Sequence, residues 1–419
     1  MPDKPVLSSG GSSDLVRAQR FPKMSPRGMI ASAMGERQLQ ISRRDFGLGA
    51  AAFGGAWISS AKASSDALTG ALGEQISAAM GANDVPGLGF GLVRSGRIVG
   101  IYGFGLADRE RGQRVTPDTV FHLASVSKVV TGAAAMQLWE QSRFKLDEPI
   151  ASYLDFPVVN PRYSAPITFR QLFTHTSSIS DKNYEGFQVT GDPVLGLRDF
   201  LVGYLAPGGK WFTPEGSFGD TEPGTRFSYS NVGLALVGYL VERIGAAPLT
   251  TQTRDRIFHP LAMSPAAWRL ADLGHARLAT PYAEKSGKLV PIEPIGYPDW
   301  PAGLLRASTR GMTRFVAAHA CGGQFEGARL LKPETMRAMV AFTAPPPLPQ
   351  GGFEAQGLFW EELHASRPGL ASKFGGDDGA CTVLAFDPAK GHGVVILTNR
   401  SPTKALYQAV AKLAEAALA

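Results

Sequence analysis

Strand-like segments lie near both ends of this chain, and helix-like segments fill the interval between them. The run "GLGFGLVRSGRIVGIYGFG" (87–105) has two apolar stretches around a Ser-Gly turn, a pattern that predicts a β-hairpin. The runs "CTVLAFDP" and "GVVILTNRS", both after residue 370, have the short apolar character of buried strands. We therefore expect an α+β fold. In this fold one antiparallel sheet is built from both ends of the mature chain, which is the chain after the leader described below, and helices flank the sheet. A mostly helical region is inserted between the two ends.

Apolar periodicity predicts the helices. The segment 126–142 is apolar and Ala-rich at its start, which indicates a helix buried in the centre of a domain. Residues 180–224 are rich in Gly, Pro and aromatic residues, and we expect them to form an insertion over a site. The other predicted helices span 65–82, 168–178, 231–245 and 402–418.

The first 63 residues differ in charge from the rest. They carry nine Lys/Arg and four Asp/Glu, whereas the remaining chain carries 33 and 32. The net charge of +6 therefore belongs mostly to this leader. No Lys/Arg-rich stripe is interleaved with aromatic residues, so we expect no nucleic-acid binding.

The leader has the layout of an export signal. Arg43 and Arg44 precede a short Gly/Ala-rich apolar run that ends in Ala61-Lys62-Ala63, which is typical of a cleavable twin-arginine signal. The run is too short for a stable membrane anchor. We expect export by the twin-arginine (Tat) machinery to the periplasm or beyond, cleavage near Ala63, and one domain over 64–419. Met34 is a more natural start than Met1.

Ser125 and Lys128 form a Ser-x-x-Lys pattern in "FHLASVSKVVTG". At the start of a helix, residues three apart lie on one face. A serine hydroxyl becomes a good nucleophile when a neighbouring base removes its proton, and a lysine can be that base if its pKa is lowered. The alternative is a helix cap beside a solvated charge.

Two further segments carry candidate site residues. Tyr229 and Asn231 lie in the turn before the helix over 231–245; a tyrosine near lysines can act as a general base, and a carboxamide can orient a lysine or a substrate amide. In the second segment, Lys373 and Phe374 precede Gly375 and Gly376. Glycines let a substrate lie along a strand edge, where backbone N–H groups can hold an oxyanion.

In this order the three motifs resemble the serine β-lactamase and penicillin-binding protein superfamily, in particular its class C β-lactamase, D-aminopeptidase and esterase branch. The resemblance covers about residues 70–415. It includes the linking segments "FKLDEPIASYL", "ITFRQLFTHTSS", "EPGTRFSYSN" and "QGLFW". It implies a β-lactamase/transpeptidase-like fold.

The resemblance implies a role for each matching residue. Ser125 matches the acylated nucleophile, and Lys128 matches the lysine that helps to deprotonate it. Tyr229 matches the general base and acid, and Asn231 matches the contact to the substrate amide. Lys373 matches the lysine of the last motif. The backbone N–H groups of Ser125 and Gly376 match the oxyanion hole.

One departure from the family pattern bears on specificity. The family's Lys-Thr-Gly or His-Thr-Gly here reads Lys-Phe-Gly, and Phe374 has no hydroxyl to hold a substrate carboxylate. If its side chain faces the site, it would also add apolar bulk there. Asp377 and Asp378 follow closely and would also disfavour an anionic substrate if they face the site; the alternative is that both are turn residues.

Two features remain open to a structural or a functional interpretation. His175 in "THTSS" lies at a predicted helix end, and we expect it to make local hydrogen bonds rather than to act in catalysis. The aromatic residues between Ile179 and Pro223 would either form an apolar substrate wall or pack on one another. Cys321 and Cys381 give no basis for predicting a disulfide.

The sequence thus predicts an exported serine hydrolase that cleaves an ester or amide through an acyl-enzyme on Ser125, with no metal or organic cofactor. Esterase-like action is favoured. One alternative is β-lactamase or D-Ala peptide hydrolase action. The other is a binding module that a ligand acylates or occupies without turnover. The partners expected are small-molecule ester, amide or peptide substrates.

Ser125→Ala tests the nucleophile. We expect turnover of a p-nitrophenyl ester to be abolished while the fold remains intact, because this change at a helix start costs only about 1 kcal/mol. Steady-state kinetics and thermal unfolding of the variant measure the two effects. Wild-type activity in Ser125→Ala would show that the assignment is wrong.

Overall fold

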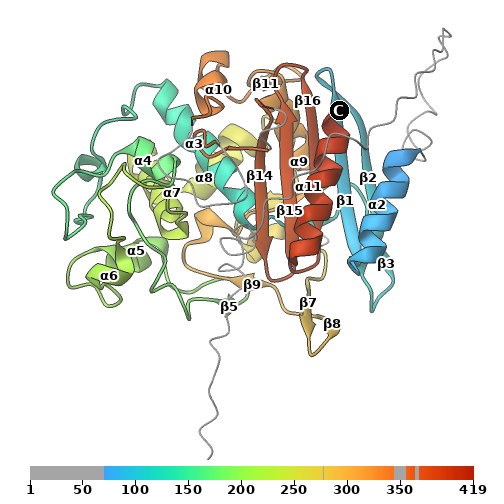
Figure 1. The fold of residues 1–419 in the computed structure, drawn as a ribbon, viewed down its shortest axis with the longest axis horizontal. Coiled ribbons are helices and arrows are strands. Elements are labelled where there is room, and N and C mark those ends of the chain that lie inside the picture. The colour runs from blue at the N-terminus through green and yellow to red at the C-terminus, as the bar shows by residue number, and fades with distance from the viewer. Residues whose placement is uncertain (1–69, 277, 344–354, 364–367) are drawn as a thin grey trace, which may run out of the picture.

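The computed structural model describes residues 70–276, 278–343, 355–363 and 368–419. Figure 1 shows a sheet on one side of the molecule and a mostly helical region on the other. The leader over 1–63, with the predicted Tat signal and the cleavage site at Ala63, lies outside the described residues.

Within the described residues, seven strands form the main sheet in the order β13-β14-β15-β16-β1-β2-β3. The central pairing joins the two ends of the chain, since β1 runs antiparallel to β16 with Leu88 opposite Thr398. The predicted antiparallel sheet from both chain ends is confirmed. The strand bounds are β1 Gly87–Arg94, β2 Arg97–Asp108, β3 Gln113–Arg114, β13 Glu361–Glu362, β14 Ala371–Asp377, β15 Ala380–Asp387 and β16 His392–Thr398.

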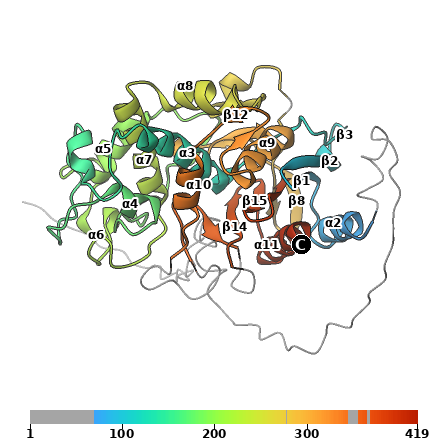
Figure 2. The same cartoon turned by 90° about the horizontal axis from the view of Figure 1, so that it is seen from above.

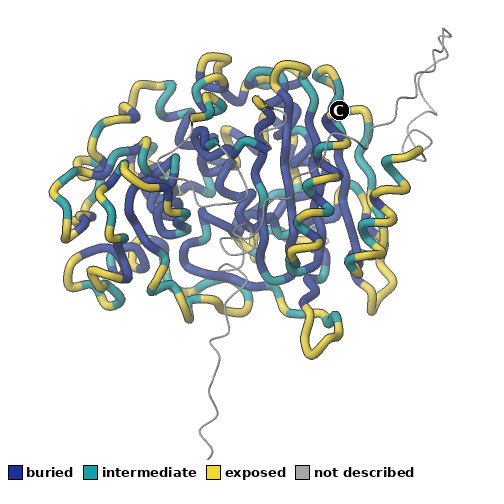
Figure 3. The backbone as a smooth tube through the Cα atoms, viewed as in Figure 1, coloured by how far each residue is buried: buried dark blue, intermediate teal, exposed yellow. Residues whose placement is uncertain are grey.

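Helices cover both faces of this sheet (Figures 1 and 2). Helices α2 (Ala71–Ala82) and α11 (Lys404–Leu418) pack on one face, and α9 (Thr309–Ala320) packs on the other. Figure 3 shows that the central strands are buried along most of their length, whereas α2 and α11 expose their outer sides. The sheet is therefore the middle layer of a three-layer arrangement.

The glycines of β1 explain how α9 approaches the sheet. A Cβ on Gly89 would lie 2.0 Å from the Thr309 hydroxyl, and one on Gly91 would lie 1.9 Å from the Thr313 hydroxyl. The alternate residues Leu88 and Phe90 point to the opposite face and join the core under α11. The alternation of Gly and apolar residues along β1 thus determines which helix packs on each face of the sheet.

The inserted region is mainly helical, as expected, and α3 and α7 pack against each other at its centre. Both are almost completely buried. The remaining helices are α3 Ser127–Glu140, α4 Phe169–Phe173, α5 Leu197–Leu205, α6 Pro214–Ser217, α7 Asn231–Gly245, α8 Leu249–Thr253 and α10 Pro333–Met339. Short 3₁₀ and π segments span Ala124–Val126, Ile150–Tyr153, Arg254–Phe258, Leu270–Leu273 and Trp300–Ala302.

Small sheets complete the fold. One contains β4 (Val120–His122), β10 (Arg306–Ser308) and β6 (Ala266–Ala267). The paired short strands are β5 Val189–Thr190 with β9 Ile295–Gly296, β7 Tyr282–Lys285 with β8 Lys288–Pro291, and β11 Gln324–Phe325 with β12 Ala328–Arg329.

Searching the described residues for a membrane span gives no single helix of sufficient length and apolarity. Only α7 together with Leu249–Phe258 passes as a pair, and the two parts bend by 81° at their junction.

The buried side chain of Asn399 joins segments that are far apart in the sequence by hydrogen bonds. Its side-chain oxygen accepts from the Gly87 N–H at 2.8 Å, and its Nδ2 donates to the carbonyl oxygens of Leu106, Ala107 and Thr280. The residue is 2% exposed. Removing it leaves several buried backbone groups without this partner.

We expect Asn399→Ala to lower the free energy of unfolding by roughly 3 kcal/mol, because each buried group left unsatisfied costs about 1–3 kcal/mol. Denaturant unfolding measures the loss. The control Asn83→Ala removes one local hydrogen bond to the Ala79 carbonyl oxygen and should cost about 1 kcal/mol. Equal losses in the two variants would contradict this role of Asn399.

Candidate active site

Ser125 lies in a tight turn immediately before α3. The turn Ala124–Val126 is a 3₁₀ segment, and Ala124 has a φ of +49°, a left-handed conformation that costs energy for a residue with a side chain. The Leu123 N–H donates to the Leu305 carbonyl oxygen, and the Leu123 carbonyl oxygen accepts from Thr382 of β15. Contacts on both sides thus hold the turn.

Lys128 places its amino group beside this turn. The side chain is 1% exposed, and its Nζ lies 3.1 Å from Ser125 Oγ. The same nitrogen donates to Asn231 Oδ1 at 2.8 Å and to the Ala302 carbonyl oxygen at 2.7 Å. A neutral amine has two N–H groups and one lone pair. When the amine is neutral, its two N–H groups can donate to Asn231 and Ala302, so its lone pair can take the proton of the Ser125 hydroxyl.

Asn231 and Tyr229 reach the site from the start of α7. The Asn231 carboxamide contacts Lys128 with its oxygen and Asp181 with its nitrogen, which lies 3.0 Å from Asp181 Oδ2. The Tyr229 ring lies between two lysine amino groups: Lys128 Nζ is 4.9 Å from the ring centroid and Lys373 Nζ is 5.0 Å from it. Both distances are typical of cation–π contacts.

Lys373 lies inside β14. Its side chain is 1% exposed, and its Nζ forms an ion pair with Glu361 of β13, itself 6% exposed. A buried charge is stable only when it is paired in this way. The carboxylate balances the positive charge of Lys373.

The two glycines of β14 bring the strand against the Ser125 turn. A Cβ on Gly375 would lie 2.5 Å from the Leu123 carbonyl oxygen and 3.2 Å from the Ser125 nitrogen, so only glycine fits without displacing the turn. Gly376 lines the same small pocket as Ser125. The residues around this pocket are Ser125, Tyr229, Asn231, Tyr297, Ala302, Gly303, Gly376 and Asp377.

Phe374 points to the other face of the sheet. Its ring packs edge-on against Tyr407 of α11, with 6.5 Å between the ring centroids, and joins the core beneath that helix. Side chains alternate along a strand, so Lys373 and Gly375 share the site face while Phe374 does not. The possibility that the Phe374 side chain faces the site and adds apolar bulk there is therefore wrong, although this residue still supplies no hydroxyl to the site.

His175 packs against the ring of Tyr229. The two rings stack with centroids 4.4 Å apart, and His175 Nδ1 accepts from the Ser230 N–H at 3.2 Å. Burial, and then the positive charges of Lys373 and Lys128, hold the pKa of His175 well below its usual value. The ring is neutral at neutral pH and has the local structural contacts that we expected.

Sequence reasoning missed two carboxylates that position the site. Asp181 accepts from the Ser230 hydroxyl and from the backbone N–H groups of Asn231 and Val232, and so caps α7. Glu361 pairs with Lys373. Glu361 follows the "QGLFW" segment directly, which was a usable signal. Asp181 lies in a loop whose residues give no such signal.

The aromatic residues of the insertion pack on one another. Phe187 contacts Tyr184, Phe200 and Trp211 at centroid distances of 5.6, 5.0 and 5.1 Å. None of these four lines the pocket at Ser125. Of the two alternatives left open by the sequence, the structure favours self-packing over a substrate wall.

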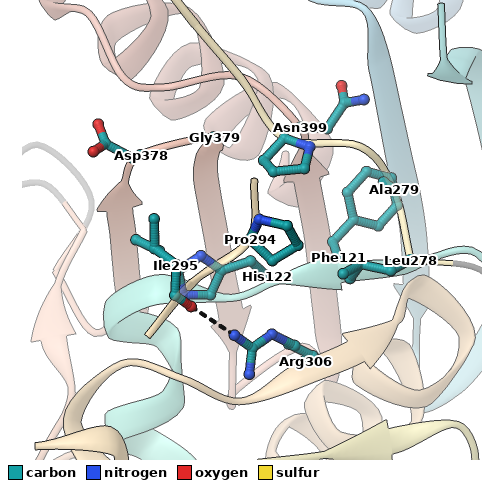
Figure 4. A pocket seen from close by; sticks show the side chains of 11 residues that line it. Phe121, His122, Leu278, Ala279, Pro294, Ile295, Arg306, Asp378, Gly379 and Asn399 are labelled. Carbon is teal, nitrogen blue, oxygen red and sulfur yellow. Dashed lines mark hydrogen bonds between the residues drawn. The ribbon is translucent and has the colours of Figure 1, made fainter. Parts of the chain in front are cut away.

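Figure 4 shows a second pocket, lined mainly by apolar residues such as Phe121, Leu278 and Ile295. Arg306 is buried there and donates to the Ile295 carbonyl oxygen at 2.8 Å. Asp378 also lines this pocket and accepts from Gln188. Asp377, in contrast, lines the pocket at Ser125.

Comparisons with known proteins agree with this geometry. A family model described as Beta-lactamase matches residues 72–419. D-alanyl-D-alanine-carboxypeptidase/endopeptidase AmpH of Escherichia coli (strain K12) is 25% identical over 301 residues, 70% of this chain and 74% of that protein. Esterase EstB of Burkholderia gladioli is 31% identical over 204 residues, 46% and 48% of the two chains.

A solved structure shows the same fold. The β-lactamase/D-alanine carboxypeptidase of Pseudomonas syringae aligns with a TM-score of 0.64 and 24% identity, over 83% of this chain and 99% of that one. At this identity the likeness concerns the fold alone.

His175 and His319, both buried, predict a pH dependence of stability. The pKa of His175 is lowered well below its usual value and that of His319 is lowered to about 4, in both cases mainly by burial. On acidification the unfolded chain is protonated first, because its histidines titrate near 6.5. The contribution of these two histidines to the free energy of unfolding is therefore fully present above about pH 6.5. Below that pH it falls, by up to about 1.4 kcal/mol per pH unit for each histidine.

Denaturant unfolding between pH 7 and pH 5 measures this slope. We expect His175→Asn to reduce it, because asparagine tolerates the φ of +57° at this position and does not titrate. The same change at His259, whose side chain is 66% exposed, should leave the slope as in the wild type. An unchanged slope in His175→Asn would contradict the neutral, buried state of that ring.

Proposed function

The chain belongs to the β-lactamase family and is a serine hydrolase; from this premise we propose that it cleaves an ester, or an uncharged amide, through an acyl-enzyme on Ser125. The observation that carries the proposal is the position of Lys128 Nζ, 3.1 Å from Ser125 Oγ and fixed by two further acceptors. A base in contact with a serine hydroxyl is the arrangement that nucleophilic catalysis requires.

The proposed reaction begins with attack of Ser125 Oγ on the substrate carbonyl carbon while Lys128 takes the hydroxyl proton. The N–H groups of Ser125 and Gly376 stabilise the oxyanion, each worth roughly a hundredfold to a thousandfold in rate. Tyr229, between Lys128 and Lys373, then passes a proton to the leaving oxygen or nitrogen as the carbon–leaving-group bond breaks, and it regains a proton from Lys128. In the second half Tyr229 and Lys128 take a proton from the water that attacks the acyl carbon and return a proton to Ser125 Oγ as the bond between that oxygen and the acyl carbon breaks, which releases the acid.

Three features of the site favour a substrate without a carboxylate. Phe374 supplies no hydroxyl on the site face. The charge of Lys373 is balanced by Glu361, and the carboxylate of Asp377 lines the pocket. An anionic group would therefore gain little attraction here and would meet a like charge. These features support an esterase-like activity over hydrolysis of β-lactams or D-Ala peptides.

Hydrolysis of D-Ala peptides is the second candidate. The likeness to AmpH, which covers 74% of that carboxypeptidase/endopeptidase, favours it. Parallel assays with a p-nitrophenyl ester, nitrocefin and a D-Ala-D-Ala peptide separate the activities. Preferred turnover of nitrocefin or of the peptide would replace the esterase proposal.

We further propose that the leader directs export by the Tat machinery and is removed near Ala63. The support is the order of the Arg43-Arg44 pair, the apolar run and the Ala-x-Ala sequence. Intact mass of the protein recovered from the periplasm tests this proposal. A protein that retains residues 1–63 would contradict it.

Lys128→Met tests the proposed base. We expect kcat/KM for a p-nitrophenyl ester to fall by roughly 10²–10⁴-fold, the usual contribution of a positioned acid or base. Labelling by a fluorophosphonate, followed by intact mass, should slow in parallel, because it uses the same nucleophile. The control Lys145→Met changes an exposed lysine and should retain wild-type kinetics.

Two outcomes would redirect the proposal. Wild-type labelling and turnover in Lys128→Met would contradict a base role for Lys128. A stable adduct on the wild-type protein without turnover of any of the three substrates would indicate a binding module that is acylated but does not release its ligand.

A further inference from the structure

The hydroxyl of Tyr407 fills the space that a side chain on Gly376 would occupy. A Cβ on Gly376 would lie 1.6 Å from this hydroxyl oxygen and 2.7 Å from the ring carbon that bears it. Gly376 lines the pocket at Ser125 and is an oxyanion donor in the proposed reaction. Tyr407 belongs to α11, which packs on the other face of the sheet. Its hydroxyl therefore touches β14 directly behind a residue of the site.

The backbone conformation does not require a glycine at position 376. Gly376 is not among the residues with a positive φ, so a residue with a side chain could adopt the same conformation. The glycine is required because the Tyr407 hydroxyl takes the space of the side chain. The two residues are thus fitted to each other.

The end of β14 that carries Gly376 depends on packing for its position. β15 pairs with β14 over residues 371–377, whereas β13 pairs only with the first two residues of β14. On the site face, Gly375 lies against the Ser125 turn. On the opposite face, the Tyr407 hydroxyl lies against Gly376. The strand is therefore held from both faces at the place where it meets the nucleophile.

The Tyr407 hydroxyl has an unfavourable environment. Its oxygen is buried and has no hydrogen-bond partner among the described residues, which costs free energy relative to exposure to water. The ring packs edge-on against Phe374, the residue at which this chain departs from the Lys-Thr-Gly pattern. Departures from good local chemistry are expected mainly at functional or strained sites.

We propose that Tyr407 is a positioning residue for the oxyanion hole: its hydroxyl, packed behind Gly376, fixes the distance between the Gly376 N–H and Ser125. This inference rests on the proposed acyl-enzyme and on Gly376 as an oxyanion donor. Such a donor stabilises the transition state only when it is already aligned with the developing charge. A small displacement of the strand therefore lowers the rate without any change to the base, Lys128.

Tyr407→Phe removes the hydroxyl and keeps the ring. We expect kcat/KM for p-nitrophenyl butanoate to fall roughly tenfold, a part of the hundredfold to thousandfold that one oxyanion donor contributes. The specific readout is the ratio of kcat/KM for this ester to kcat/KM for its thiono analogue, in which sulfur replaces the carbonyl oxygen. Sulfur is a weak hydrogen-bond acceptor, so the ratio should fall in Tyr407→Phe. The midpoint of denaturant unfolding should stay equal or rise, because a buried hydroxyl without a partner is removed.

Tyr102→Phe is the matched control. A Cβ on Gly100 would lie 2.2 Å from the Tyr102 hydroxyl, and Tyr102 packs against the same core under α11, but it belongs to β2. We expect this variant to keep the wild-type kcat/KM and ratio. An unchanged ratio in Tyr407→Phe overturns the inference, whether kcat/KM stays the same or falls equally for both substrates, as a general loosening of the fold would produce. An equal fall of the ratio in Tyr102→Phe also overturns it.

A complementary pair of changes tests the contact itself. Gly376→Ala places a Cβ against the Tyr407 hydroxyl and should lower kcat/KM roughly a hundredfold or more, the contribution of one donor. Adding Tyr407→Ala removes the hydroxyl and the ring, and should raise kcat/KM of the Gly376→Ala protein roughly tenfold. A folded double variant that is no faster than Gly376→Ala overturns the inference. If the double variant does not fold, the ratio in Tyr407→Phe decides alone.

The two proposals fail in different ways. Absence of Ser125-dependent turnover of p-nitrophenyl butanoate by the wild-type protein contradicts the proposed function itself. Ser125-dependent turnover with the wild-type ratio in Tyr407→Phe contradicts only the role of Tyr407, and leaves a hydrolase whose oxyanion hole is held by other contacts.

Discussion

The contact between Lys128 and Ser125 is the interaction on which the site depends. Lys128 Nζ joins the turn before α3 to Asn231 at the start of α7 and to the Ala302 carbonyl oxygen. Each of these groups comes from a different part of the inserted region or from its junction with the sheet. A buried amine with three hydrogen-bond partners restricts their relative positions, because any displacement would leave polar groups unsatisfied. The same contact gives the serine its proton acceptor.

The sheet supplies the other wall of the site. β14 reaches the Ser125 turn because the C-terminal strands follow one another across the sheet and β16 pairs with β1. The glycine at 375 lets the strand lie against the Leu123 carbonyl oxygen. Charge is then distributed along one strand face: Lys373, balanced by Glu361, at one end and Asp377 at the other. The site has a base near the nucleophile and a carboxylate in the same pocket.

Much of this arrangement could be predicted from the sequence, because it depends on local patterns. Apolar alternation located the hairpin over 87–105 and the strands after residue 370, and the long apolar run located α3. The three motifs and their order indicated the family. Ser125, Lys128, Tyr229 and Lys373, predicted from separate segments, lie together in the structure.

The details that the sequence did not specify depend on contacts between distant segments. Alternate residues of β14 point to opposite faces of the sheet, and Phe374 falls on the face that packs against α11. No local sequence pattern specifies which set of alternate residues faces the pocket. The partner of Lys373 is Glu361, on a neighbouring strand, and the cap of α7 is Asp181, from a loop. The packing of Phe187 against Trp211 also depends on chain segments that meet only in the folded protein.

The acyl-enzyme on Ser125 is the central claim, and rapid mixing with a p-nitrophenyl ester tests it most directly. The measurement is the amplitude of the first burst of p-nitrophenol, together with the mass of the peptide that contains Ser125 after acid quenching. The account predicts a burst approaching one equivalent per protein when acylation is faster than release, and an acyl group on Ser125 in every case. Ester turnover with no acyl group on that peptide at any quench time would contradict it.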